Sequence, residues 1–283
     1  MFGIYNAENA LRFELQKSYK IFDDWNKEFP KIDALYIDWI AKANNKGYAL
    51  QATIVDRYIK KKIPIVIFDR YLYMKKEEIE WLRKFNNVFL FEPALHNRFG
   101  FRYLPQSVKI LKYEDLESKK YEWDLGYKGH LINKSYSFEK YFKKFAESNL
   151  DKKVCYSSAA ITMRSEEYRY ANLKKLDDVN WNDIKCTVAI DTHKHYAMGY
   201  LDNWVFKAME KGCMVLLPVE HKYFGNMFNK LVVNNIKDIE ILSMNLKGSI
   251  NQIIIEEIYN NIENLYPEFT MDYTIEIIKE CVK

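Results

Sequence analysis

The polar pair Asp69-Arg70 is the first of four segments whose residue types and spacing could do chemistry. It directly follows the apolar run from Ile63 to Phe68, which has the composition of a buried parallel strand. A carboxylate at the end of such a strand can be partly desolvated, and desolvation raises its pKa towards that of a useful general base. The alternative for this pair is a helix cap or a local Asp–Arg ion pair.

A glycine-containing turn is the second segment, which runs from Gly126 through Gly129 and His130 to Lys134. Glycine lets the backbone approach a ligand closely, and the N–H groups at the start of a helix favour negative charge. Lys128, His130 and Lys134 could add positive charge against a diphosphate. Because the segment has neither a GxGxxG nor a P-loop pattern, an ordinary strand-to-helix turn is the alternative.

The third segment, Asp191 to Tyr196, follows an apolar strand and contains the pair His193-x-His195. Two histidines at this spacing suggest a metal site, but the sequence offers no third ligand at a suitable spacing. We therefore predict no metal here. We expect Asp191 to accept a hydrogen bond from a sugar hydroxyl.

The fourth segment, Asp202 to Glu220, has the pattern of a helix that ends at Gly212 and leads into a buried strand, which ends in Pro218 and an acidic residue. Units of this kind border the crevice where α/β sheets bind nucleotides. Asn203 and Lys207 lie in the first turns of the helix, where they could bind a ribose or a diphosphate. The alternative is a helix that only packs against its sheet.

The elements that position these segments alternate between strands and helices. Short apolar runs predict strands, and apolar residues at helical spacing separate them. This alternation predicts a doubly wound α/β domain over residues 1–112. Its predicted strands are 2–5, 32–38, 63–68, 87–91 and 101–104, and its predicted helices are 47–62 and 75–85.

A second α/β domain is predicted over residues 113–265, where the charged stretch 112–123 has the polarity of a linker. A C-terminal helix within 266–283 could pack back on the first domain. Besides the helix-strand unit already described, the predicted strands are 125–129, 154–156, 186–190 and 231–233, and the predicted helices are 137–148, 250–265 and 271–282.

Length and composition limit the class of protein. The 283 residues suffice for two domains, and a hydrophobic content of 48% is typical of a globular chain. No apolar run approaches the roughly eighteen residues of a membrane span and the start lacks a signal-peptide pattern, so we expect a cytoplasmic protein. The 4 cysteines show no paired spacing and are expected to be reduced packing residues. The net charge of +4 is far below that of a dedicated nucleic-acid binder.

The order of these segments resembles the GT-B glycosyltransferases, and among them the T-even phage DNA β-glucosyltransferases. The matching stretches are 32–37, 63–70, 101–109, 124–129 and 186–218. The resemblance implies an α/β fold of two facing Rossmann-like domains with a C-terminal helix. It places the acceptor on the N-terminal domain and a UDP-sugar mainly on the C-terminal one.

Carried over position by position, the resemblance implies that Asp69 is the catalytic base and that Gly129 and His130 form a phosphate turn. Asp191 falls near the donor. Basic residues would bind the acceptor and its phosphates: Arg70, Arg98 and Arg102, with Lys60, Lys61 and Lys62 beside them.

The sequence departs from the family pattern at residues of the expected donor-binding site. Lys207 and Trp204 stand where the family has a Glu and an Arg, and Ile132 and Tyr136 stand where its phosphate turn has arginines. Three interpretations stay open: another donor, a degenerate enzyme, or diphosphate binding by other side chains. The side chains that could do so are Lys134, Lys207 and Asn203.

The resemblance implies a metal-independent, inverting hexosyltransferase that needs no cofactor. It would move a sugar, expected to be glucose, from a UDP-sugar to a 5-hydroxymethylpyrimidine in double-stranded phage DNA. We would then expect a monomer in the host cytoplasm with no membrane partner. The alternatives are a bacterial GT-B enzyme for a spore, cell-wall or small-molecule acceptor, and a non-catalytic binding module.

Overall fold

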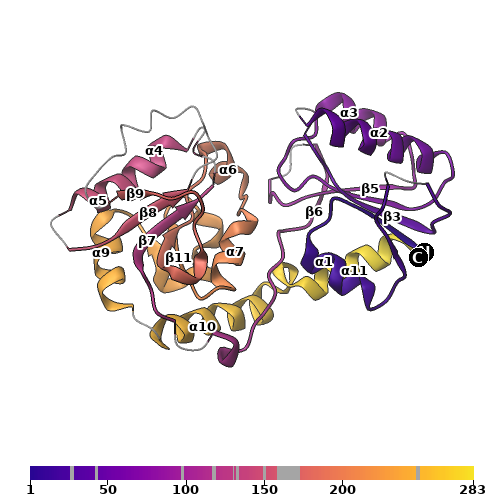
Figure 1. Ribbon diagram of the computed structural model, residues 1–283. Coiled ribbons are helices and arrows are strands. Elements are labelled where there is room, and N and C mark those ends of the chain that lie inside the picture. Colours follow the sequence, from indigo (N-terminus) through magenta and orange to yellow (C-terminus); the bar gives the residue numbers. More distant parts are fainter. Residues whose placement is uncertain are drawn as a thin grey trace. The chain divides into compact units, whose positions relative to one another are not determined.

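The computed structural model describes residues 1–25, 29–41, 44–96, 99–116, 119–129, 131, 134–148, 151–157, 173–246 and 249–283. They form two compact units, here called unit 1 (1–107 with 268–283) and unit 2 (108–267). Each unit is built around one six-stranded sheet, and every strand pairing described is parallel (Figure 1). These two sheets, with helices packed on them, confirm the predicted α/β class.

Unit 1 has the strand order β2-β1-β3-β4-β5-β6. Its strands are β1 (Phe2–Tyr5), β2 (Ile21–Phe22), β3 (Ala34–Asp38), β4 (Ile65–Phe68), β5 (Val88–Glu92) and β6 (Arg102–Tyr103). Its helices are α1 (Asn9–Gln16), α2 (Asn45–Ile59), α3 (Lys76–Leu82) and α11 (Met271–Cys281).

Alternate residues of the unit 1 strands face two separate cores, as the pleat of a strand requires. Leu35 and Ile37 of β3 pack with buried side chains of α2 and α3, whereas Ala34 and Tyr36 pack with buried side chains of α1 and α11. Helices α2 and α3 therefore cover one face of the sheet, and α1 and α11 cover the other (Figure 1).

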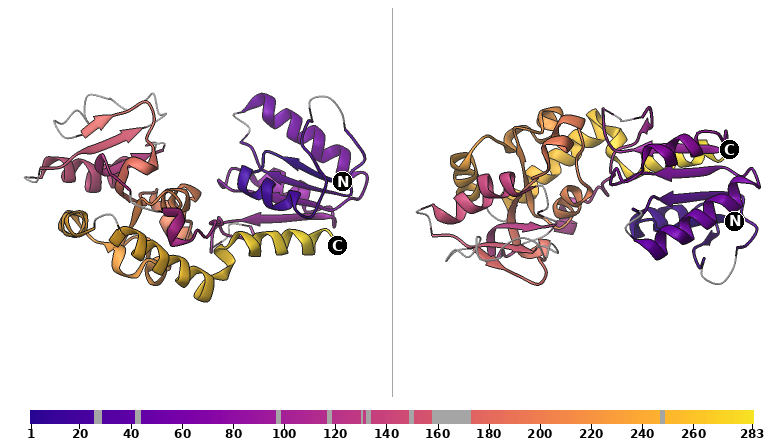
Figure 2. Two further views of the ribbon diagram at one scale, coloured as in Figure 1. Left: turned by 60° about the horizontal axis from the view of Figure 1, so that its bottom comes forward. Right: turned by 90° about the horizontal axis from the view of Figure 1, so that it is seen from above.

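Helix α11 belongs to unit 1 although it comes from the far end of the chain. It packs against α1 and β4 and is the yellow helix beside the strands of this unit in Figure 2. The Ser107 hydroxyl lies 3.6 Å from the Met271 sulfur near the start of the helix. The chain leaves unit 1 after Ser107 and returns at Glu268, whereas the sequence predicted boundaries after 112 and 265.

Unit 2 has the strand order β12-β11-β10-β7-β8-β9. Its strands are β7 (Trp123–Lys128), β8 (Val154–Ser157), β9 (Leu173–Lys175), β10 (Ile184–Val188), β11 (Met214–Pro218) and β12 (Val232–Val233). Its helices are α4 (Ser135–Phe138), the π-helix η2 (Glu139–Lys143), α5 (Lys144–Glu147), α6 (His193–Met198), α7 (Asn203–Met209), α8 (Gly225–Phe228), α9 (Ile236–Asn245) and α10 (Ser249–Leu265). Short 3-10 turns are η1 (Tyr113–Leu116), η3 (Trp181–Asp183), η4 (Lys222–Phe224), η5 (Asn229–Leu231) and η6 (Pro267–Phe269).

The two strand orders each contain one topological switch point. Numbered within its own unit, the first sheet reads 2-1-3-4-5-6, an extension of the flavodoxin-like order, and its direction reverses between β1 and β3. The second reads 3-2-1-4-5-6, the order of dinucleotide-binding Rossmann domains, and reverses between β7 and β10. In open α/β sheets, ligands bind outside the carboxyl ends of the strands at these points.

Three segments differ from their predicted structure. Stretch 112–123, predicted as a linker, contains η1 and the first residue of β7. Residues 193–198, predicted only as a strand exit, form α6. The predicted helix 137–148 is divided into α4, η2 and α5. Among the described residues, no helix has both the length and the apolar character needed to cross a bilayer.

Candidate functional sites at the two switch points

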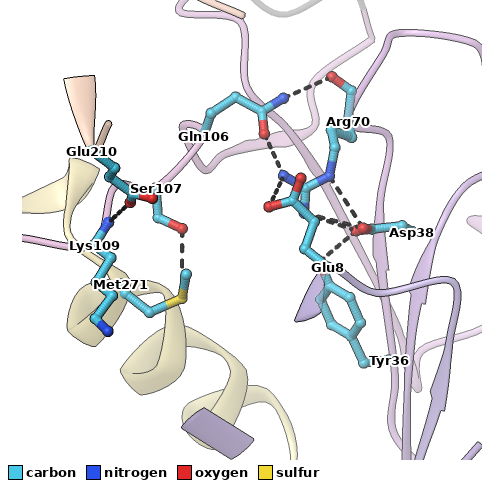
Figure 3. Close-up of polar contacts among 9 residues, drawn as sticks. All are labelled: Glu8, Tyr36, Asp38, Arg70, Gln106, Ser107, Lys109, Glu210 and Met271. Carbon is cyan, nitrogen blue, oxygen red and sulfur yellow. Dashed lines mark hydrogen bonds and ion pairs between the residues drawn. The ribbon is translucent and has the colours of Figure 1, made fainter. Parts of the chain in front are cut away.

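A buried arginine organises the switch point of unit 1. The Arg70 guanidinium donates to the Asp38 carboxylate from Nε at 3.1 Å and from Nη2 at 3.3 Å, and it pairs with Glu8 at 3.4 Å (Figure 3). Glu8 follows β1, Asp38 ends β3 and Arg70 follows β4, so the parallel sheet brings their side chains to one edge. We call Glu8, Asp38 and Arg70 the unit 1 cluster.

Two neutral side chains complete the hydrogen bonds of this cluster. The Tyr36 hydroxyl donates to Asp38 at 2.6 Å, and the Gln106 side chain accepts from Arg70 Nη1 while its amide donates to the Arg70 carbonyl (Figure 3). Burial raises the pKa of the Asp38 carboxyl, and the Arg70 charge opposes that effect only in part. The Glu8 side chain is 19% exposed, against 5% for Arg70, so Glu8 is the member that solvent or a ligand can reach.

Asp69, the predicted base, lies beside this cluster but is fully buried. Its two carboxylate oxygens accept the backbone N–H groups of Tyr73 at 2.7 Å and Met74 at 2.9 Å. Its own N–H donates to the Phe91 carbonyl at 2.8 Å. In this conformation the carboxylate holds the loop after β4.

The other predicted acceptor arginines are not members of the cluster. Arg102 lies on β6, where its guanidinium carbon is 5.6 Å from the centre of the Phe89 ring. Burial raises the pKa of the Cys281 thiol of α11, and the Arg102 charge opposes this rise. Arg98 lies outside the described residues.

The switch point of unit 2 holds a lysine, an aspartate and a histidine, here called the unit 2 cluster. Asp191 Oδ1 lies 3.2 Å from Lys134 Nζ and 2.6 Å from His195 Nδ1, and it accepts the Thr192 N–H at 2.8 Å. Asp191 follows β10, and His195 lies on α6, whose first turn the Thr192 hydroxyl caps at 3.2 Å. Since an ionised carboxylate only accepts, Nδ1 of His195 donates the hydrogen bond.

The charges of this cluster stabilise one another. Burial alone would lower the pKa of Lys134, but the carboxylates around it, Asp191 foremost, raise its pKa above the usual value. Burial alone would raise the pKa of Asp191, yet the hydrogen bond from His195 and the Lys134 charge lower it overall. Burial raises the pKa of Asp202, which precedes α7. The lysine therefore stays cationic and Asp191 anionic at neutral pH.

Gly129 lies in the turn after β7 in a conformation that requires glycine. Its φ is +152°, and a Cβ there would lie 2.9 Å from the Tyr127 hydroxyl oxygen. The backbone N–H of Gly129 donates to the Ser157 carbonyl at 3.1 Å. His130, the next predicted ligand, lies outside the described residues.

The donor-helix residues fall into two groups. Asn203 is 3% exposed, and the partly buried Trp204 stacks on Trp181 with ring centres 5.6 Å apart. Lys207 is exposed on the outer face of α7. The role of Lys207 as a donor ligand therefore stays a prediction.

Several residues near these sites were not predicted as functional. His221 follows β11 in the interior, where Nε2 donates to the Ala189 carbonyl at 3.0 Å and burial lowers the pKa of the ring to about 4. Glu220 accepts from Lys140 Nζ at 2.7 Å and from the Tyr141 hydroxyl at 2.9 Å. An acidic residue directly after an apolar run was the available signal for Asp38 and Glu220.

Within the described ranges, no group of three or more His, Cys, Asp or Glu side chains is arranged to hold a metal.

No protein-family model matches the sequence, and no curated protein matches it. Among solved structures, glycosyltransferase VinC in complex with dTDP is similar over 88% of this chain and 72% of its own, with 11% identity and a TM-score of 0.39. Arabidopsis thaliana UGT89C1 complexed with quercetin is similar over 92% of this chain and 75% of its own, with 10% identity and a TM-score of 0.37. Glycosyltransferase SnogD from Streptomyces nogalater is similar over 95% of this chain and 77% of its own, with 9% identity and a TM-score of 0.40. At these scores, conclusions about activity must come from the chain's own residues.

Proposed function

We propose that the chain is a glycosyltransferase of the GT-B type that moves a sugar, glucose in the simplest case, from a UDP-sugar to a hydroxyl acceptor. One observation carries this proposal. Unit 2 has the strand order of dinucleotide-binding domains, and a lysine paired with Asp191 lies at its switch point. The UDP donor and the acceptor come from the resemblance, and the residues at each switch point support a division between donor and acceptor binding.

The unit 2 cluster suits the donor. Its lysine side chain is 11% exposed and is kept cationic by the surrounding carboxylates, so it can stabilise the charge that develops on a departing diphosphate. Asp191 orients the lysine and His195, and its carboxylate can accept a hydrogen bond from a sugar hydroxyl. Gly129 lets the backbone of the β7 turn approach the phosphates. Asn203 and Lys207, with His130, remain predicted donor ligands.

The unit 1 cluster suits the acceptor. In a direct displacement, the acceptor oxygen bonds to the anomeric carbon as the carbon–diphosphate bond breaks, and the hydroxyl proton passes to a carboxylate. This displacement inverts the anomeric centre and releases UDP. Asp69 remains the predicted base, while Glu8 is a second candidate because its side chain is partly exposed and paired with Arg70.

We further propose a 5-hydroxymethylpyrimidine of double-stranded DNA as the acceptor, as the resemblance implies. Phosphate contacts would come from Arg98 and Arg102. The lysines 60–62 follow α2 and precede β4, so they lie at the opposite, amino edge of the sheet from the unit 1 cluster. The second candidate function is a nucleotide-sugar binding module without turnover. The full burial of Asp69 and the exposure of Lys207 favour that second candidate.

Sugar transfer from UDP-glucose, detected by mass spectrometry, tests the proposal. The acceptors are a 5-hydroxymethylcytosine duplex, the unmodified duplex and a panel of hydroxylated small molecules. We expect transfer to the modified duplex, unchanged by EDTA, and loss of at least about a hundredfold in kcat when the base is neutralised. Asp69→Asn and Glu8→Gln identify which carboxylate that is. UDP-glucose binding without transfer to any acceptor would favour the binding module, and no binding would contradict both.

A further inference from the structure

We propose that Tyr71 and Tyr73 form a platform on which a planar aromatic ring of the acceptor stacks. This inference rests on the proposed function, because it assigns the class of acceptor at unit 1. It predicts that the hydroxyl receiving the sugar is carried by an aromatic ring system rather than by an aliphatic chain.

The two tyrosines are exposed next to each other at the carboxyl edge of the unit 1 sheet. Tyr71 is 41% exposed and Tyr73 is 50% exposed, and both lie in the loop that follows β4. Their ring centres are 5.5 Å apart with 34° between the ring planes. Two neighbouring rings with these exposures present a large aromatic surface to solvent, and burying it on a ligand is favourable.

The backbone of the loop turns these rings outward. Asp69 accepts the N–H groups of Tyr73 and Met74, and the Leu72 N–H donates back to the Asp69 carbonyl at 3.1 Å. Leu72 has a φ of +57°, a left-handed conformation that is unfavourable for leucine. Its side chain and that of Met74 are buried, at 9% and 3% exposed. The alternating buried residues therefore leave the tyrosine side chains on the outer surface.

Both ends of the loop are fixed by polar side chains. The Asp69 carboxylate binds the end of the loop at Tyr73 and Met74, and Arg70 is held at the start by Asp38 and Gln106. A platform fixed in this way loses little conformational freedom when a ligand binds, which favours affinity. The buried Asp69 carboxylate thereby acquires a positioning role that needs no direct contact with the acceptor.

The position of the platform connects it with the unit 1 cluster. Arg70 directly precedes Tyr71 and pairs with Asp38 at the carboxyl end of β3, the strand next to β4. An aromatic ring stacked on the tyrosines would thus lie at the sheet edge that carries Glu8. A base in a nucleic acid and a small phenolic molecule share this chemistry, since stacking on a tyrosine requires only a π-face.

Acceptor kinetics of four proteins test the platform: wild type, the double variant Tyr71→Ala/Tyr73→Ala, the double variant Tyr71→Phe/Tyr73→Phe, and Phe13→Ala. Phe13 is 61% exposed on α1 and serves as a matched loss of a surface ring. We expect the alanine pair to raise the acceptor KM about tenfold, whereas the phenylalanine pair and Phe13→Ala stay near wild type. The dissociation constant for UDP should be the same in all four proteins.

Two acceptor arms distinguish the sources of the ring, a 5-hydroxymethylcytosine duplex and 4-nitrophenol. If the alanine pair raises the KM tenfold only for the duplex, the stacked ring is a nucleobase. If it raises the KM only for 4-nitrophenol, the acceptor is a small aromatic molecule. An unchanged KM in both arms, or an equal loss with the phenylalanine pair, overturns the inference while wild-type transfer leaves the proposed function standing. If the wild type transfers no sugar, saturation-transfer NMR with each probe decides. Weaker binding to the alanine pair supports the platform, and equal or absent binding overturns it.

Discussion

The two switch points occupy the same topological place in their sheets but contain different charges. In unit 1 a single guanidinium is shared between two carboxylates, Glu8 and Asp38. In unit 2 the Asp191 carboxylate contacts both an ammonium and an imidazole, and a second carboxylate, Asp202, acts on the same ammonium. The first arrangement leaves an excess of negative charge that can accept a proton. The second brings cationic or proton-donating groups to the place where a diphosphate would bind. The difference indicates that one sheet edge is suited to an acceptor hydroxyl and the other to an anionic leaving group.

Burial has opposite net results for the two central carboxylates. The pKa of Asp38 is raised because the effect of desolvation is larger than the opposing effect of the Arg70 charge. The pKa of Asp191 is lowered because the effects of the His195 hydrogen bond and the Lys134 charge together are larger than that of desolvation. Ionising the central carboxylate therefore costs more free energy in the unit 1 cluster than in the unit 2 cluster. The stability of the ionised unit 1 cluster depends more strongly on its cation.

Removal of each cation is the strongest test of this comparison. Arg70→Met should lower the free energy of unfolding by about 3–5 kcal/mol, because it takes the cation away from the buried Asp38 carboxylate, which keeps the hydrogen bond from the Tyr36 hydroxyl. Lys134→Met should cost less, about 1–3 kcal/mol, because Asp191 keeps its hydrogen bonds from His195 and Thr192. Urea unfolding measures both.

The exposed Lys60→Met serves as the control for these two variants and should change little. Adding Asp38→Asn to Arg70→Met should restore part of the lost stability, because it removes a buried charge. A larger loss for Lys134→Met than for Arg70→Met would contradict the comparison.

His221 should make the stability of unit 2 depend on pH. Its ring has a pKa of about 4 when folded and 6.5 ordinarily, so between these values the unfolded chain binds more protons. The stability of unit 2 should therefore fall as pH decreases from 6.5 to 4, by up to about 3 kcal/mol. His221→Gln should flatten this part of the pH–stability curve, and His193→Gln, at an exposed position, should not. Equal curves for His221→Gln and wild type would exclude this role.

The smallest expected effect is the order in which the two carboxylates titrate. Carbon-13 NMR of the side-chain carboxyls should place the midpoint of Asp38 above 3.8 and that of Asp191 below it. Asp191 then contributes stability that is present above its ordinary pKa and lost as pH falls through its folded value. Asp38 contributes stability that is present at low pH and lost as pH rises through its folded value. The reverse order of midpoints would refute the electrostatic difference between the clusters.

Local pattern was enough to predict the central strands and the α2 helix. Four consecutive apolar residues form β4, and α2 has the helical spacing that its buried residues require. Helix α1 was not predicted because only Leu11 and Leu15 of its 8 residues are buried, which is too few to define a period. Helix α6 was not predicted because its 6 residues bury only Tyr196.

The sites depend on pairings that no local pattern contains. Asp38 and Arg70 are 32 residues apart in the chain and meet only because β3 and β4 are neighbours. The same is true of Lys134 and Asp191, which come from segments beside β7 and β10. The sequence could predict that Asp69 follows a buried strand, but not that its carboxylate would accept two backbone N–H groups of the next turn.

The central claim is that a nucleotide binds at the β7/β10 switch point of unit 2, and calorimetric titration with UDP tests it most directly. The wild type should bind UDP, and Lys134→Met should weaken binding about tenfold or more, because a charge-assisted contact with the diphosphate is lost. Lys128→Met is the matched control, since Lys128 ends β7 but pairs with Asp178 at 2.7 Å. It should bind UDP like the wild type. Wild-type affinity in Lys134→Met, or no UDP binding by the wild type, would contradict the account.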